Sequence, residues 1–223
     1  MKTKILFIAF FIFQTIAVLA QDMTSLKTEA LKSYKAGVNM NFDAIFETTY
    51  PKVFDIIPQE QMKTMFGQMM ENEQFSIKLV EVDPGFSFGE IKKIEGKMFC
   101  LIGHNNVMAM KFKEPMNDAE SMTDIFKSSM NAEKVTYDKA TNTFRIEMRS
   151  TLIAVADELT KKQWKFLNKD KDNKLFSMIF DEKIVKISKF ISSSFSHSYK
   201  NHCRCSHSCS SRNKLQEHQH QLT

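Results

Sequence analysis

The stretch from residue 143 to 157 constrains the fold of this chain more than any other. Its even-numbered positions are apolar apart from Ser150, and they are Phe144, Ile146, Met148, Leu152, Ala154 and Ala156. The odd-numbered positions begin as Arg145, Glu147 and Arg149 and end as Ile153 and Val155. Such alternation is typical of a strand. It predicts a strand with one face in solvent at its start and both faces buried at its end, in a curved sheet that helices cover.

Three helical patterns come before the sheet. Residues 22–36 predict a helix, which Gly37 is expected to end. Asn41 is expected to cap a second helix, and Pro51 interrupts the apolar run that follows, which indicates a kink or two short helices. A third helix is predicted to begin at Pro58.

A stripe of methionine and phenylalanine runs along the third predicted helix with spacings of three and four residues: Met62, Met65, Phe66, Met69 and Met70. Soft thioether side chains suit a copper site or an adaptable binding groove. Helical spacing of this kind is also typical of a face packed into a core, and core packing is the interpretation we favour.

Shorter runs predict the remaining strands. Residues 75–79 and 86–94 each predict one strand. A strongly apolar run from Met98 to Phe112 predicts either one long strand with a bulge at Gly103 or a hairpin that turns at residues 104–106. The residues do not decide between these two alternatives.

The rest of the core completes the order of elements. Asp118 is expected to cap a helix between strands, and residues 135–137 predict a strand. A last strand is expected through Trp164 and Phe166, before a C-terminal helix that opens at Asp172. This order predicts an α+β fold, with three N-terminal helices packed on a curved, mainly antiparallel sheet. We expect residues 21–190 to form a single domain.

The N-terminus is typical of an export signal. Lys2 and Lys4 precede an apolar run over residues 5–19, and Val18 and Ala20 suit a cut before Gln21. The alternative is an uncleaved membrane anchor, for which the run is short. Residues 1–20 are therefore predicted to be a signal peptide of a protein that becomes periplasmic or secreted, with no membrane span after cleavage.

The composition changes abruptly after residue 190. Residues 191–223 are rich in Ser, His and Cys, and they contain a compact group of possible metal ligands: His202, Cys203, Cys205, His207 and Cys209. A structural zinc site normally separates two ligand pairs by a dozen residues or more, so this spacing argues against one. We interpret the segment as a disordered tail, which translation from a shifted reading frame would explain.

The net charge of +5 does not indicate that the protein binds nucleic acid. The signal peptide contributes +2 and the tail +3, which leaves 25 basic and 25 acidic residues between positions 21 and 190. Because phosphate binding needs a concentrated positive surface, a neutral core excludes an interaction based on charge.

Two resemblances follow from these elements. Three leading helices before a long bent antiparallel sheet resemble the cone-shaped fold of ketosteroid isomerase, SnoaL-like cyclases and nuclear transport factor proteins. Residues 94–102, 112–115 and 156–166 are similar to a group of uncharacterised exported bacterial proteins. The first resemblance implies an enzyme with an acid or base inside a cavity, and the second carries no known activity.

The candidates for such a site are isolated polar residues. Tyr34, Asp43, Tyr50 and Asp157 are available as acids or bases, but none lies in a catalytic motif. Asp43 falls in the first turn of a predicted helix, where the helix dipole favours a negative charge. Each of the four is more typical of a structural role.

Cys100 and His104 are the Cys and His of the core. Cys100 lies in an apolar run and is expected to be a buried free thiol. His104 is expected in a turn or on the surface rather than as a general base. On one continuous strand the two side chains would share a face but lie too far apart for direct contact.

These observations predict an exported α+β protein that binds an apolar small molecule or an envelope protein without catalysis. The alternatives are an isomerase-like or dehydratase-like enzyme of the cone fold and a structural interaction protein. No cofactor is expected, because nothing resembles a glycine-rich nucleotide loop, a serine nucleophile or a metalloprotease helix.

Overall fold

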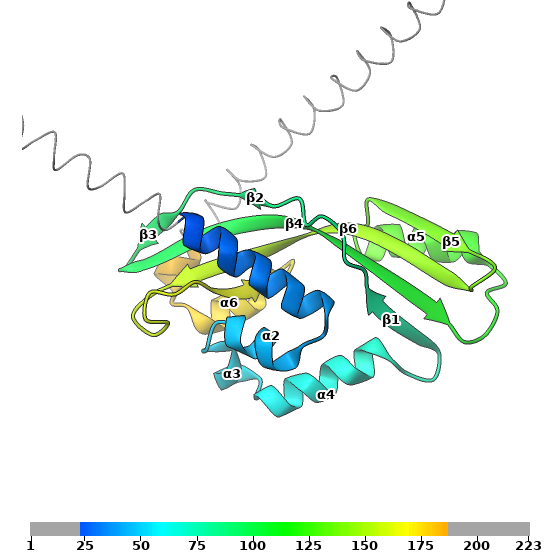
Figure 1. Cartoon of the computed structure of the whole chain (residues 1–223), viewed down its shortest axis with the longest axis horizontal. Helices are drawn as coiled ribbons and strands as arrows, with labels where there is room; N and C mark the ends of the chain where they lie inside the picture. Colours follow the sequence, from blue (N-terminus) through cyan, green and yellow to red (C-terminus); the bar gives the residue numbers. More distant parts are fainter. Residues whose placement is uncertain (1–22, 187–223) are drawn as a thin grey trace, which may run out of the picture. The chain divides into compact units, whose positions relative to one another are not determined.

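A computed structural model describes residues 23–186 of the chain (Figure 1). The chain divides into two compact units, residues 1–179 and 180–223. In the second unit the described residues are 180–186, of which 182–186 are helical. The predicted export signal, its predicted cleavage site and the Ser/His/Cys-rich tail lie outside the described residues.

In the described part of the first unit, two long strands form the centre of a seven-stranded sheet. They are β4 (Lys97–Phe112) and β6 (Thr143–Ala156), and they pair antiparallel without interruption from Met98–Ala156 to Lys111–Thr143. The other edge of β4 pairs with β1 (Phe75–Leu79), β2 (Ser87–Phe88) and β3 (Lys92–Ile94). The other edge of β6 pairs with β5 (Lys134–Asp138) and β7 (Lys165–Asn168).

This pairing decides between the alternatives for the strand around Gly103. The hairpin at residues 104–106 and the bulge are both wrong, because Gly103 pairs in regular register with Thr151 and Ser87. The predicted strand over 86–94 is instead two short strands separated at Gly89, a residue that weakens a strand interior.

The helices match their predicted starts more closely than their ends. Helix 23–38 continues past Gly37, and the chain turns at Met40, which has a φ of 53°. α2 (Phe42–Thr48) is capped by Asn41, whose Oδ1 accepts a hydrogen bond from Ala44 N. α3 (Val53–Ile56) follows Pro51, and α4 (Gln59–Met70) follows Pro58. α5 (Ala119–Ser129) is capped by Asp118, and α6 is Lys174–Ile179.

Two apolar clusters lie on the same face of β4 and β6, the face of their even-numbered residues. At one end, Leu26 and Ala30 of helix 23–38 pack against residues that include Ile102, Ala154 and Trp164. At the other end, Phe126 of α5 packs against residues that include Phe144 and Ile146. The chain is thus an α+β protein with a mainly antiparallel sheet.

The opposite face confirms the pattern of residues 143–157. Arg145, Glu147 and Arg149 are only half-buried there, whereas Ile153 and Val155 are buried. At the buried end the ring of Phe99 lies 6.1 Å from that of Phe176 in α6. Alternation in the sequence therefore predicted burial correctly on both faces of this strand.

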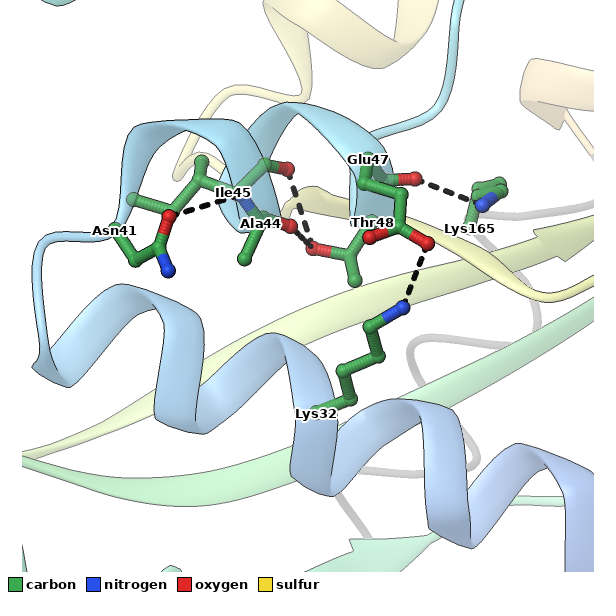
Figure 2. A network of polar contacts seen from close by, with 7 residues as sticks. All are labelled: Lys32, Asn41, Ala44, Ile45, Glu47, Thr48 and Lys165. Atoms are coloured by element: carbon green, nitrogen blue, oxygen red, sulfur yellow. Dashed lines mark hydrogen bonds and ion pairs between the residues drawn. The ribbon is translucent and has the colours of Figure 1, made fainter.

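α2 is tied to its neighbours by polar contacts (Figure 2). Glu47 forms an ion pair of 2.7 Å with Lys32 of helix 23–38, and its carbonyl oxygen accepts a hydrogen bond of 2.7 Å from Lys165 at the start of β7. The hydroxyl of Thr48 donates to the carbonyl oxygens of Ala44 and Ile45. The helix is thus held from two sides.

Candidate functional site

A cavity of about 660 Å³ lies between the helices and the even face of the sheet. Pockets that hold drug-sized ligands have volumes of roughly 300–1,000 Å³. The lining is mainly apolar and comes from helix 23–38, from α2 to α4, and from the sheet; its apolar residues include Ile45, Val53, Ile57, Met62, Met65, Phe66, Met69, Leu79, Leu152 and Phe166.

The methionine stripe of α4 forms one wall of this cavity. Met65 and Met69 are 51% and 53% exposed, and α4 has no buried residue. The favoured interpretation of the stripe as core packing is therefore wrong for α4. The helix forms as predicted, but its apolar face meets an open cavity instead of close-packed side chains, so thioether groups remain accessible.

His104 lies on the sheet side of the cavity. It is 8% exposed, so the expectation of a turn or surface residue is wrong. His104 and Ile102 are two residues apart on β4. Because the strand is continuous there, their side chains point to the same face of the sheet. Its ring packs edge-on to Tyr34, at 5.9 Å between centroids, and lies 6.2 Å from Phe86.

A single hydrogen bond defines the tautomer of His104. Nδ1 lies 3.0 Å from the carbonyl oxygen of Asn105, which can only accept, so Nδ1 carries the proton. Burial lowers the pKa of His104, the contact with Asn105 raises it, and the positive charge of Arg149 lowers it; the net shift is downward. A neutral imidazole in this tautomer leaves Nε2 as a hydrogen-bond acceptor.

Tyr34 and Asn106, two other polar residues of the lining, have hydrogen-bond partners. The Tyr34 hydroxyl donates to Val82 O at 3.0 Å and accepts from Val82 N at 3.2 Å. Asn106 Nδ2 donates to Ser150 Oγ at 3.2 Å. Tyr34, one of the four predicted site residues, therefore lines the cavity with its hydroxyl bonded to the backbone.

Tyr50 and Asp157, two further predicted site residues, meet in the interior. The Tyr50 hydroxyl donates to Asp157 Oδ2 at 2.8 Å, and Lys97 Nζ lies 3.3 Å from the same oxygen. Asp157 Oδ1 accepts from Thr160 N at 3.1 Å. Neither Tyr50 nor Asp157 is among the residues that line the cavity.

The protonation of this pair follows from its surroundings. Burial, together with the hydrogen bond to Asp157 and its charge, raises the pKa of Tyr50 well above its usual value. Burial also pushes the pKa of Asp157 upward, but hydrogen bonds from Tyr50, Thr160 and Lys97 and the charge of Lys97 outweigh it and hold that pKa below normal. The pair is thus a phenol bonded to a carboxylate.

Asp43 and Cys100 stand apart from the cavity. Asp43 is exposed in the first turn of α2, as its sequence position predicts. Cys100 is a buried free cysteine, as expected, and its Sγ lies 3.3 Å from Gly89 O. Burial raises the pKa of its thiol to about 12, although the backbone contact with Gly89 opposes this. No pattern in the sequence indicated that His104 would border a cavity, because that depends on the register of β4.

Metal ligation finds no support in the described part. Residues 23–186 contain no group of three or more His, Cys, Asp or Glu side chains placed to hold a metal ion. The candidates His202, Cys203, Cys205, His207 and Cys209 lie outside the described residues. Within the same range, the helices are too short or too polar to cross a membrane.

Comparison of the chain with protein-family models, with curated protein sequences and with solved structures found no match. The cavity and its lining are therefore the basis for assigning a function.

Proposed function

We propose that this chain is an exported protein that binds an apolar small molecule in the cavity between α4 and the sheet, without catalysing a reaction on it. The observation that carries the proposal is the cavity of about 660 Å³ with its mainly apolar lining. An apolar molecule that enters such a space loses contact with water, which contributes roughly 25 cal/mol for each Å² buried.

The accessible methionine side chains of α4 support the same proposal. Met is unbranched and polarisable, so a methionine wall adapts to ligands of different shape. Met65 and Met69 are about half exposed, and contact with a ligand would cover them. Export is the part of the proposal that rests on the sequence alone, on the signal-like residues 1–20.

Catalysis by the cone-fold mechanism has less support. It needs an acid or base that faces the substrate. Asp157 and Tyr50 are hydrogen-bonded to each other away from the cavity lining, and Asp43 is exposed on α2. Binding is therefore the function that the geometry supports best.

Titration with N-phenyl-1-naphthylamine, an uncharged fluorophore that brightens in apolar surroundings, tests the proposal on the purified full chain. We expect saturable binding of one probe molecule per chain, and native mass spectrometry of protein purified without the probe should show a co-purified small molecule. A folded protein that neither binds the probe saturably nor carries a small molecule would overturn the proposal.

A further inference from the structure

The lining of the cavity has a property that narrows the class of ligand. Among residues 23–186, no Lys, Arg, Asp or Glu side chain lines the cavity. A carboxylate, a phosphate or an ammonium group placed there would lose its hydration without gaining a counter-ion, which is strongly unfavourable. The chemistry of the lining therefore favours an uncharged ligand.

His104 contributes a buried polar side chain to this lining. Among the described residues its Nε2 has no hydrogen-bond partner, and no buried side-chain nitrogen or oxygen there lacks one. Nε2 must therefore be accessible, and His104 borders the cavity. His104 is thus more than nine-tenths buried, borders the cavity and has an acceptor atom that is not fully covered.

The lining also contains Ser33, Gln68, Asn106 and Asn168, which are half-buried or exposed, whereas His104 is buried. The hydroxyl groups of Tyr34, Thr48 and Thr49 all donate to backbone carbonyl oxygens. The ligand group that complements Nε2 must be a donor, because a lone pair facing a second lone pair gains nothing.

We propose that the occupant of the cavity is an uncharged alcohol with a hydrocarbon chain, whose hydroxyl group donates a hydrogen bond to His104 Nε2. The chain of the alcohol lies along the methionine wall of α4. This inference rests on the proposed function, since it names the ligand class of the same cavity.

Three ten-carbon compounds test the inference by displacing N-phenyl-1-naphthylamine from the full chain. 1-Decanol carries the hydroxyl donor, 1-methoxydecane keeps the oxygen without the donor, and decanoate carries a charge. We expect 1-decanol to displace the probe at a concentration about tenfold lower than either of the others, the factor for one well-formed hydrogen bond.

The variant His104→Phe keeps an aromatic ring beside Tyr34 and Phe86 but removes the acceptor. In this variant, the concentration of 1-decanol that displaces the probe should rise to the concentration of 1-methoxydecane that does so. The displacing concentration of 1-methoxydecane should change less than twofold. Saturable probe binding by the variant shows that its cavity is intact. Met178→Gln, an exposed change on α6 away from the cavity, should keep the preference for the alcohol.

The outcomes separate the two proposals. If the probe binds but the alcohol and the ether displace it equally, or decanoate displaces it best, the inference about His104 is wrong while the binding function stands. If the folded chain binds neither the probe nor any of the three compounds, the proposed function itself fails. The comparison on the unsubstituted chain decides the matter even where His104→Phe does not fold.

Discussion

The hydroxyl of Tyr50 lies 2.8 Å from Oδ2 of Asp157, although the two residues are 107 positions apart in the sequence. Tyr50 is in the link between α2 and α3, and Asp157 directly follows β6. The link is also held by Tyr50 N, which donates to Phe166 O at 2.9 Å. The pair therefore joins the helices that border the cavity to the buried end of the sheet.

Replacing Tyr50 by phenylalanine should lower the free energy of unfolding by about 2 kcal/mol, because the buried carboxylate loses a hydrogen-bond donor. Urea unfolding of the full chain, followed by circular dichroism, measures this. Tyr137→Phe is the matched control, since its hydroxyl bonds to the neutral Asn142 in a half-buried position and should contribute about 1 kcal/mol or less. Equal losses in the two variants would contradict the structural role of the pair.

The contact between Tyr50 and Asp157 also predicts that the free energy of unfolding depends on pH. The pKa of Asp157 is lower in the folded protein than its ordinary value, so the folded state binds the proton less readily than the unfolded state. The stabilisation is complete above about pH 4, the ordinary aspartate pKa, and is lost as pH falls through the folded pKa. The advantage of the unsubstituted chain over Asp157→Asn should therefore be constant above about pH 4 and shrink as the pH is lowered further into the acid range. An advantage in unfolding free energy that stays constant over this range would refute the assignment.

Polar substitutions on α4 should weaken ligand binding without unfolding the protein. In the double variant Met65→Gln/Met69→Gln, the dissociation constant of N-phenyl-1-naphthylamine should rise at least fivefold, because the cavity wall becomes polar. The free energy of unfolding should change by less than about 0.5 kcal/mol, since neither side chain is buried. Met178→Gln, on the exposed surface of α6, should leave both quantities unchanged. Weaker probe binding in this control would indicate a non-specific effect.

Cys100 should resist alkylation until the protein unfolds. Burial raises its pKa to about 12, so at neutral pH its thiolate population is about a thousandfold below that of an ordinary thiol, and the sulfur is shielded as well. Treatment with iodoacetamide, then mass spectrometry of the tryptic peptide 98–111, follows this residue alone. We expect no modification in native buffer and complete modification in urea. Rapid modification of the native protein would contradict the buried position.

The turn at Gly85 should not accept a side chain. Gly85 has a φ of 49°, and a Cβ added there would lie 2.7 Å from Asn105 Nδ2, which is itself held by Asp83 O. Gly85→Ala should therefore lower the free energy of unfolding by about 1–2 kcal/mol. Gly67→Ala in α4 is the opposite case, because nothing lies within 4 Å and alanine favours a helix. Gly67→Ala should leave the free energy of unfolding unchanged or raise it. Equal losses of this free energy in the two variants would argue against strain at Gly85.

Local patterns in the sequence predicted most of the elements. Asn41 and Asp118 cap helices as their positions predict, because a capping side chain bonds to a backbone amide only three residues away. The alternation over residues 143–157 predicted the burial of β6 on each face, since parity along a strand determines the side on which a residue lies. Capping and alternation could be predicted because both depend on residues that are close together in the sequence.

The wrong predictions concern places where segments far apart in the sequence pack together. Gly103 suggested a bulge or a nearby turn, yet β4 pairs with β6 in a continuous, regular register through this residue. The stripe of α4 suggested a core face, but whether an apolar face meets other side chains or an open cavity depends on the helices and strands opposite it.

By itself, the sequence determined the α+β class, the positions of most helices and strands, and the neutral charge of the core, because these follow from local periodicity and composition. Only the tertiary structure decided that Tyr50 meets Asp157 and that His104 borders a cavity walled by the methionines of α4. These relationships depend on strand register and helix placement, which contacts between residues far apart in the chain determine.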